Sequence, residues 1–447
     1  MAPLMEQTAP SRNISAAGTA TILTATGPRA STPPGVPARD RPPSTRRLNA
    51  LHLTPRMSLT RLAIFLSVVL TVSSAIHYYL WARLVRDVAW PLATHRGLTV
   101  LLISLAVLLP ASFILMRVLP VSRAVLSPIS WVLYTWMGLM FCLFVLLIPA
   151  DLVRFIGWLI ERFSGAPVDP ARRLFLARLF GGAVGLGGLA MAGWGLYAVS
   201  RPVAIKRVDV ALADLPAAFA GFRIVQLSDI HVGPTIGKDF IEQLVASTNA
   251  LQPDIVAITG DLVDGSVANL GKFLGPLRDL KTKHGVYFVT GNHEYFSGAD
   301  EWIAHLRGLG VTVLRNERVT LERGGAAIDL AGIDDPTGPS FGQDHGPDLT
   351  RALAGRDPAR PVILLAHQPK AIREAADHGV ALQLSGHTHG GQIFPFNFLV
   401  KLQQPFVAGL HRLRDTMIYV SPGTGYWGPP MRVGAPAEIT DITLRVA

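Results

Sequence analysis

The segment RIVQLSDIH, residues 223–231, joins a short apolar run to two side chains that can bind metal, Asp229 and His231. Four further apolar runs end where the polar motifs TGDLVD, GNHE, AHQP and GHTHGGQ begin. Short apolar runs bounded by turn residues are typical of buried strands. The sequence therefore predicts five strands with functional side chains at their carboxyl ends, at residues 223–227, 254–259, 286–290, 362–366 and 381–384.

Helical patterns lie between these strands, at residues 240–251, 270–280, 300–309 and 370–378. Alternation of strands and helices favours an α/β fold, in which ligands collect at the carboxyl edge of the sheet. Four later segments are expected to be strands of a second sheet that packs onto the first. The predicted fold class is therefore α/β, a two-sheet β-sandwich flanked by helices; the later strands are residues 319–322, 327–331, 416–420 and 438–446.

The composition is too apolar for a wholly soluble chain, with 447 residues, 49% hydrophobic content and a mean hydropathy of +0.35. Each of four runs without charges has the roughly 20 residues that a membrane-spanning helix needs. Buried helices of a soluble core are the alternative, but such helices rarely continue this long without a charge. The runs are residues 62–82, 97–116, 125–150 and 179–199, and the single cysteine, Cys142, lies in the third, so no intramolecular disulfide exists.

Three parts of the chain follow from these patterns. Residues 1–58 are rich in Pro, Ala, Thr, Ser and Arg and lack apolar periodicity, so they are expected to be a disordered arm. Translation that starts at Met57 is an alternative that would remove this arm. Residues 59–200 are predicted to form a membrane region with four transmembrane helices, and residues 201–447 a catalytic domain.

Each polar motif alone is weak evidence, because a single GNH or GD pair is commonly a turn or a helix cap. Their conjunction is informative: five of the ten histidines after Arg201 lie inside these motifs. A mixture of carboxylate, amide and imidazole suits two divalent ions that share a bridging carboxylate. In extended chain, Asp229 and His231 would point the same way. The candidate metal ligands are Asp229, His231, Asp261, Asn292, His367, His387 and His389.

The ordered series DxH, GDxxD, GNHE, an isolated His and GHTH resembles the calcineurin-like metallophosphoesterase superfamily, over about residues 222–425. The resemblance implies one metal held by Asp229, His231, Asp261 and His389, and a second held by Asp261, Asn292, His367 and His387. It also implies manganese, with iron or zinc as alternatives. His293, beside Asn292, is the candidate general acid for the leaving group, and Asp264 would orient it.

Further segments resemble the bacterial membrane-associated branch of that superfamily, which includes UDP-2,3-diacylglucosamine hydrolase-type enzymes. These are the HTHGGQ ending, the stretch SPGTGYWGPPMRVGAPAEIT at 421–440 and the preceding membrane runs. The branch implies hydrolysis of a phosphodiester or pyrophosphate bond in a lipid-linked substrate. Arg432 is expected to be exposed and is left out of the predicted site. A candidate acyl-chain or membrane contact, with a core-packed loop as the alternative, is formed by Ile393, Phe394, Phe396, Phe398, Leu399 and Val400.

Other functions remain open at this stage: a general phosphatase or nuclease of the same fold, or a non-catalytic membrane sensor. A degenerate sensor would be expected to lack a ligand or His293, and none is missing. The net charge of +10 lies mainly in the arm and the membrane flanks, not in a basic stripe, which argues against nucleic-acid binding. The expected partners are membrane lipid and a phosphorylated small-molecule or lipid substrate, and the oligomeric state is undecided.

The arginines give a prediction of membrane topology. Arg172 and Arg173 resemble a twin-arginine export signal, with an ordinary basic flank as the alternative. In the full sequence, eight basic residues lie in the first and third loops and nine on the other side, so the count does not decide the topology. A start at Met57 leaves six on the other side, which favours an extracytoplasmic catalytic domain. That location conflicts with a cytoplasmic UDP-lipid substrate, so both expectations cannot hold together.

Overall fold

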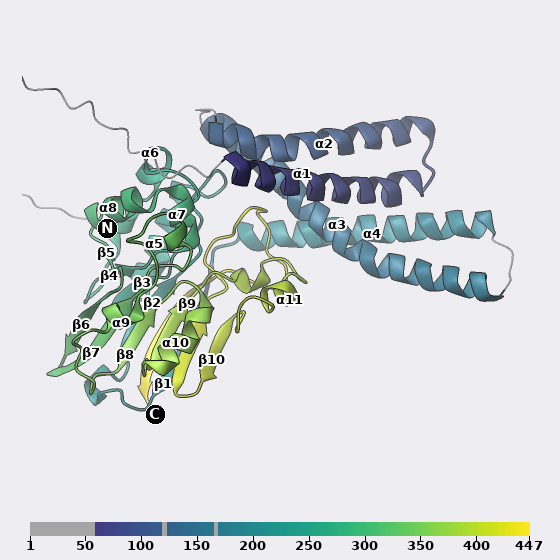
Figure 1. The fold of residues 1–447 in the computed structure, drawn as a ribbon. Helices are drawn as coiled ribbons and strands as arrows, with labels where there is room; N and C mark the ends of the chain where they lie inside the picture. Colours follow the sequence, from purple (N-terminus) through teal and green to yellow (C-terminus); the bar gives the residue numbers. More distant parts are fainter. Residues whose placement is uncertain (1–58, 119–122, 165–168) are drawn as a thin grey trace, which may run out of the picture. The chain divides into compact units, whose positions relative to one another are not determined.

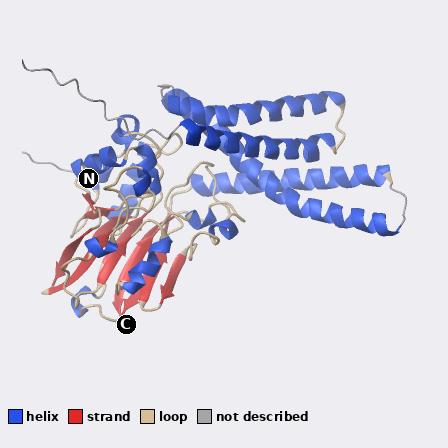
Figure 2. Cartoon of the chain, in the orientation of Figure 1, coloured by secondary structure: helices blue, strands red, loops and turns tan. Residues whose placement is uncertain are grey.

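The computed structural model describes residues 59–118, 123–164 and 169–447 (Figure 1). The expected disordered arm and the alternative start at Met57 lie outside these residues. Long helices form the first part of the described chain, and two sheets with short helices form the rest (Figure 2).

Each predicted membrane run coincides with a long helix. The helices are α1 (Leu59–Trp81), α2 (Leu92–Val118), α3 (Arg123–Ser164) and α4 (Pro170–Ser200). The first run extends one residue past α1, into a π-helical turn at Ala82–Arg86. All four helices are long and apolar enough to cross a membrane. Large apolar side chains are exposed on them, as expected of surfaces that face lipid.

Asp151, a charged residue within α3, has several partners. The Asp151 carboxylate accepts hydrogen bonds from the Tyr79 hydroxyl, at 2.6 Å, and from Arg83 Nε, at 2.9 Å. Arg154 Nη1 lies 3.4 Å from the other oxygen of the same carboxylate. Ion pairing of this kind reduces the cost of placing a charge in an apolar environment.

Two six-stranded sheets follow the helices. In the first, β2 to β5 are parallel, β12 pairs antiparallel with β2, and β1 pairs parallel with β12. Its order is β1 (Ala204–Leu212), β12 (Glu438–Val446), β2 (Arg223–Leu227), β3 (Ile255–Ile258), β4 (Val286–Phe288) and β5 (Thr312–Val313).

The second sheet is also mixed, with antiparallel pairs at its two edges and β7, β8, β9 and β11 parallel. Its order is β10 (Gly409–Leu413), β11 (Thr416–Val420), β9 (Leu382–Ser385), β8 (Val362–Leu365), β7 (Ala326–Gly332) and β6 (Glu317–Arg323). The remaining helices are α5 (Lys238–Ala250), α6 (Val267–Leu270), α7 (Asn292–Ser297), α8 (Ala299–Gly308), α9 (Leu349–Ala352), α10 (Ile372–Asp377) and α11 (Asn397–Val400).

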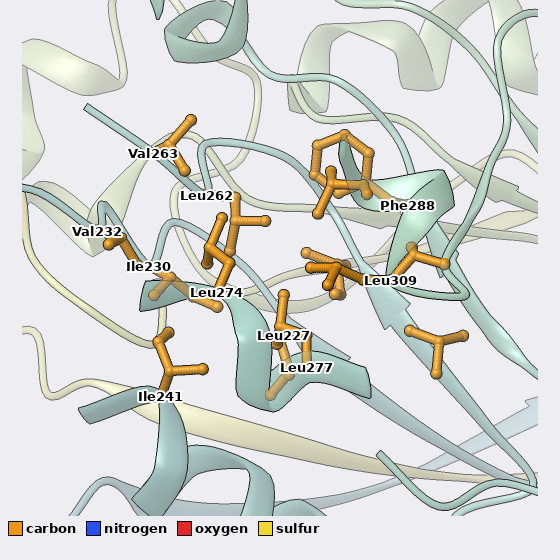
Figure 3. Packing of buried hydrophobic residues seen from close by; sticks show 14 of the residues in the cluster. Leu227, Ile230, Val232, Ile241, Leu262, Val263, Leu274, Leu277, Phe288 and Leu309 are labelled. Carbon is orange, nitrogen blue, oxygen red and sulfur yellow. The ribbon is translucent and has the colours of Figure 1, made fainter. Parts of the chain in front are cut away.

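Apolar layers cover both faces of each sheet. Ile224 and Ile255 from the first sheet share one core with Leu330 and Ile363 from the second. On the outer face of the first sheet, Leu227 and Phe288 pack with residues of α5, α8 and the loops between them; the residues labelled in Figure 3 belong to this cluster. Strands buried on both faces explain why the sequence shows continuous apolar runs there instead of alternation. The predicted two-sheet sandwich flanked by helices is confirmed.

Two details of the sequence prediction are wrong, and strands β1, β5 and β10 were not predicted. Residues 438–446 form β12 in the first sheet, where Ile442 pairs with Ile224, and not in the second sheet. Residues 270–280 do not form one helix, because α6 ends at Leu270 and two 3-10 turns follow, at Gly271–Phe273 and Gly275–Asp279. Glycine and proline are the residues least suited to a helix interior. Strand β1 was not predicted, since its first four residues are exposed and it lacks an apolar run.

The core between the sheets gives a prediction about stability. Leu330 is fully buried there, whereas Leu402 is 81% exposed. We expect Leu330→Ala to lower the free energy of unfolding by about 2–5 kcal/mol, because it removes buried methyl groups and leaves a cavity. Leu402→Ala should change it by less than about 0.5 kcal/mol. Denaturant unfolding of both variants, followed by tryptophan fluorescence, provides the measurement, and equal midpoints would contradict this assignment of the core.

Candidate metal centre

The predicted metal ligands follow strand ends in unusual backbone conformations. Five of the seven have a positive φ: Asp229 at 52°, His231 at 56°, Asp261 at 51°, His387 at 70° and His389 at 51°. The expectation that Asp229 and His231 share an extended chain is therefore wrong. Residues with side chains rarely adopt this left-handed region, and such strain is concentrated at functional sites.

Two of the glycines beside these turns make room for the cluster. A Cβ at Gly386 would collide with Ser228 Oγ and with a carboxylate oxygen of Asp229. Gly260 has φ 85°, and a Cβ there would lie 2.7 Å from the His367 Nδ1 atom. The lack of a side chain at these two glycines therefore lets the backbone approach the cluster closely.

The first group contains Asp229, His231 and His389. The Nε2 atoms of His231 and His389 face each other at 3.1 Å, and Asp229 Oδ1 lies 3.4 Å from His389 Nε2. His231 Nδ1 is 3.2 Å from Asp264 Oδ1. Since a carboxylate accepts the hydrogen bond, His231 Nδ1 donates to Asp264, and Nε2 is the ring nitrogen that faces the cluster.

The second group contains Asp261, His367 and His387, with Asn292 beside them. His367 Nδ1 donates to the Thr259 carbonyl at 2.7 Å. Its Nε2 atom lies 3.1 Å from Asp261 Oδ2, 3.2 Å from His387 Nδ1 and 3.3 Å from Asn292 Oδ1. Asp261 Oδ2 is also 4.0 Å from His231 Nε2. One carboxylate oxygen thus lies near both groups, as a bridging ligand requires.

The protonation states differ among the side chains of the cluster. Burial lowers the pKa of His367, but the charge of Asp261 outweighs it and holds that pKa well above its usual range, so His367 would have to release a proton to bind a metal. His387, His389 and Asp261 behave differently. Burial, together with the positive charge of His367, lowers the pKa of His387 to about 3. Burial and the charge of His231 hold the pKa of His389 well below its usual range. Burial opposes ionisation of Asp261, but His367 and His293 outweigh it and hold its pKa low. Neutral imidazoles and an ionised carboxylate are the forms that bind metal.

His293 and Asp264 lie together beside the two groups. Asp264 Oδ1 is 2.5 Å from His293 Nδ1, and the same oxygen contacts His231 Nδ1. Burial lowers the pKa of His293, but the charges of Asp261 and Asp264 outweigh it and raise the pKa to about 9. The imidazole is therefore protonated at neutral pH, with Nδ1 occupied by Asp264. Asp264 also contacts His231, and the sequence did not predict this second contact.

Glu294 is a part of this centre that the sequence analysis missed. It is fully buried, and its carboxylate accepts hydrogen bonds from the amides of Gly291, Leu262 and Asp261 at 2.7, 2.8 and 3.0 Å. Burial and the charge of Asp261 raise the pKa of Glu294 to about 7. A Glu three residues after Gly291 is the capping-box position, and this signal was available in the GNHE motif.

Arg432 was expected to be exposed, and this is wrong: it is only 2% exposed. Its guanidinium donates to the backbone carbonyls of Gly425, His389, Ala435 and Pro422 at 2.8–3.2 Å. Burial lowers its pKa to about 10, so it stays charged at neutral pH. The Gly- and Pro-rich sequence around it gives no periodic signal from which burial could be inferred.

Comparison with known proteins agrees with this geometry. Residues 222–391 match the model of the family described as calcineurin-like phosphoesterase. A bovine (Bos taurus) transmembrane protein with metallophosphoesterase domain is 40% identical over 333 residues, which cover 71% of this chain and 74% of the relative. The chain belongs to the calcineurin-like phosphoesterase family. It is a metal-dependent hydrolase of phosphoric ester bonds, and the family implies divalent metal ions.

Two bacterial relatives of this phosphoesterase have names that state no specific substrate. An uncharacterised metallophosphoesterase from Helicobacter pylori is 44% identical and covers 57% of this chain and 68% of its own length. Another, from Bacillus subtilis, is 32% identical and covers 62% of this chain and 98% of its own length. The transmembrane relative and the four apolar helices support a membrane protein.

The centre predicts different outcomes for two substitutions. Asp261→Ala should abolish turnover and reduce metal content, because its carboxylate lies near both groups. His293→Ala should lower turnover by about 10²- to 10⁴-fold, the usual contribution of a general acid, while metal stays bound. Turnover and metal content by elemental analysis are the measurements. His378→Ala, which alters a histidine outside the cluster, is the control; wild-type turnover in Asp261→Ala would refute the assigned centre.

Proposed function

We propose that this phosphoesterase hydrolyses a phosphodiester or pyrophosphate bond in a lipid-linked substrate at the membrane surface. The proposed substrates are phospholipids or lipids that resemble UDP-diacylglucosamine. In this proposal two divalent ions, preferably manganese, are held by Asp229, His231, Asp261, Asn292, His367, His387 and His389. The main support is an exposed apolar segment that lies close in sequence to His389 and contacts a membrane helix.

The proposed chemistry assigns separate tasks to the side chains. Bound divalent ions would supply positive charge that activates water and neutralises phosphoryl oxygens. His293, protonated at neutral pH, donates its proton to the leaving-group oxygen as the bond to phosphorus breaks. Asp264 holds Nδ1 of that imidazole and so leaves the Nε2 side for the substrate. Hydrolysis consumes one water and yields a phosphate and an alcohol or second phosphate.

The apolar segment at residues 393–402 supports a lipid substrate. Its first residue, Ile393, is buried and packs in the interior, so the prediction that Ile393 contacts an acyl chain is wrong. Four of its large side chains are 46–57% exposed, namely Phe394, Phe396, Phe398 and Leu399, and Leu402 is 81% exposed. The Phe396 ring meets Phe141 of α3 edge to face, with centroids 6.1 Å apart. Contiguous exposed apolar side chains mark contact surfaces, and this one continues the apolar surface of a membrane helix.

Aromatic side chains beside His293 support an apolar leaving group. The edge of the His293 ring meets Trp427, with centroids 5.5 Å apart, and Phe296, at 5.6 Å. Both aromatic side chains are about half exposed. A leaving group bound at His293 would therefore lie near two exposed aromatic side chains.

The decisive experiment compares a lipid phosphodiester with its deacylated headgroup. Wild type should turn over the lipid faster, because the segment at 393–402 would bind acyl chains that the headgroup lacks. The double substitution Phe396→Ser with Phe398→Ser should raise KM for the lipid by about tenfold, which corresponds to about 1.4 kcal/mol of lost apolar contact. It should leave headgroup turnover unchanged.

Val446→Ser provides the matched control for this comparison. Val446 is an exposed apolar residue at the end of β12, outside the segment at 393–402. Its substitution should not affect either substrate. Equal turnover of lipid and headgroup by wild type would remove the case for a lipid-linked substrate, and a preference for nucleic acid would favour the nuclease alternative.

The topology of the membrane region gives a further prediction. We propose that the catalytic domain lies outside the cytoplasm, on the basis of the basic residues in the first and third loops. Because UDP-lipids are cytoplasmic, this location favours a phospholipid over a lipid that resembles UDP-diacylglucosamine as the substrate. Arg172 pairs with Glu161 at 3.7 Å, and this contact does not distinguish an ordinary basic flank from an export signal. External protease should digest the catalytic domain in intact spheroplasts. Protection there, with digestion only after permeabilisation, would place the domain in the cytoplasm.

A further inference from the structure

We propose that the membrane helices α3 and α4 hold His389 in position through the dipeptide Met431–Arg432, so that these helices are part of the scaffold of the metal centre. The inference rests on the proposed ligand role of His389. It goes beyond that role, because it assigns a positioning function to residues that contact neither metal nor substrate.

Met431 fits into a socket formed by two glycines, one on each helix. The side chain is fully buried, in a cluster with Cys142 of α3, Ala192 of α4 and Ile393. A Cβ at Gly138 of α3 would lie 2.6 Å from Met431 Sδ, and one at Gly195 of α4 would lie 2.9 Å from Met431 Cβ. Both glycines therefore face Met431 at a distance that leaves no space for a larger residue.

The backbone of the same dipeptide is bonded to α4. The Arg432 amide donates to the carbonyl of Gly195 at 3.2 Å. Side-chain packing and a main-chain hydrogen bond thus meet at one position of the helix. Without α3 and α4, the Met431 side chain would lose the residues that cover it, so its burial depends on the membrane region.

The Arg432 side chain connects this contact to the metal centre. Its Nη1 atom donates to the carbonyl of His389 at 3.2 Å, and the other bonds reach Gly425, Ala435 and Pro422. Hydrogen bonds from a charged donor are stronger than neutral ones. The buried guanidinium of Arg432 therefore connects the backbone of His389 to the segment that contains Met431.

A second connection runs through neighbouring backbone. The Val433 amide donates to Gln392 O at 2.8 Å, and the Phe394 amide donates to Val433 O at 2.9 Å. Gln392 Nε2 also donates to the carbonyls of Trp427 and Pro429. Gln392, the last residue of the GHTHGGQ motif, therefore forms hydrogen bonds with residues that precede Arg432 and with the residue that follows it. A shift of Met431 would move this motif together with His389, whose φ of 51° needs support from its surroundings.

The test uses the full chain in lipid nanodiscs and compares two glycines on one helix. Gly195→Leu should displace Met431, whereas Gly193→Leu should not, because nothing lies within 4 Å of a Cβ at Gly193. In metal-free protein, hydrogen–deuterium exchange of residues 386–393 should become faster in Gly195→Leu and stay at the wild-type rate in Gly193→Leu. Metal affinity should fall by about tenfold in Gly195→Leu, the lower end of the effect of losing a residue that orients a ligand.

A second pair of variants covers the case in which Gly195→Leu does not fold. Met431→Ala should give the same faster exchange and weaker metal binding, and Met431→Leu, which conserves volume, should restore both. Equal exchange in the two glycine variants, or in Met431→Ala and wild type, would overturn the inference. Because exchange is measured without metal or substrate, failure of the proposed lipid specificity would leave this result unchanged.

Discussion

Left-handed backbone turns at the ends of parallel strands are the constraint on which the metal centre depends. Each such residue costs about 1–3 kcal/mol, so the surrounding structure must stabilise it. The loops after β2 and β3 do this for each other: the Asp229 amide donates to Gly260 O and the His231 amide to Asp261 O, both at 3.1 Å. The strands that set these loops in register are buried on both faces. The geometry of the ligands is therefore a consequence of apolar packing in the sandwich.

The same dependence explains what could be predicted from the sequence. Strands such as β2 and β8 were found because burial on both faces produces an apolar run, which a single sequence displays directly. The candidate ligands were found because their motifs follow those runs. Their backbone conformation was not, because the turns are fixed by hydrogen bonds between loops far apart in the sequence. Strand β1 was missed since its exposed residues carry no periodic signal.

Arg432 and Glu294 were missed for a related reason: each acts on backbone groups. The Arg432 guanidinium and the Glu294 carboxylate bind main-chain carbonyls and amides. Of these contacts, only that of Glu294 with Gly291 has a signal in the sequence, the capping-box spacing of the GNHE motif. Their residue types alone gave the opposite expectation, since charged side chains are usually exposed. The packing of Met431 on α3 and α4 also crosses the boundary predicted at residue 201. The boundary at residue 201 stays a prediction. Met431, which lies beyond it, packs against helices that precede it.

The order of the first sheet has a consequence for how the protein is made. Strand β1 follows α4 directly, yet β12, some 230 residues later, is the strand that joins it to β2. Pairing between segments so distant in the sequence is slow, because a long loop must close first. During synthesis β1 emerges beside the membrane with its backbone groups unpaired, and the sheet can be completed only when residues 438–446 have left the ribosome. An unpaired strand edge is prone to aggregation, so the edge of β1 is a site of possible aggregation throughout this interval.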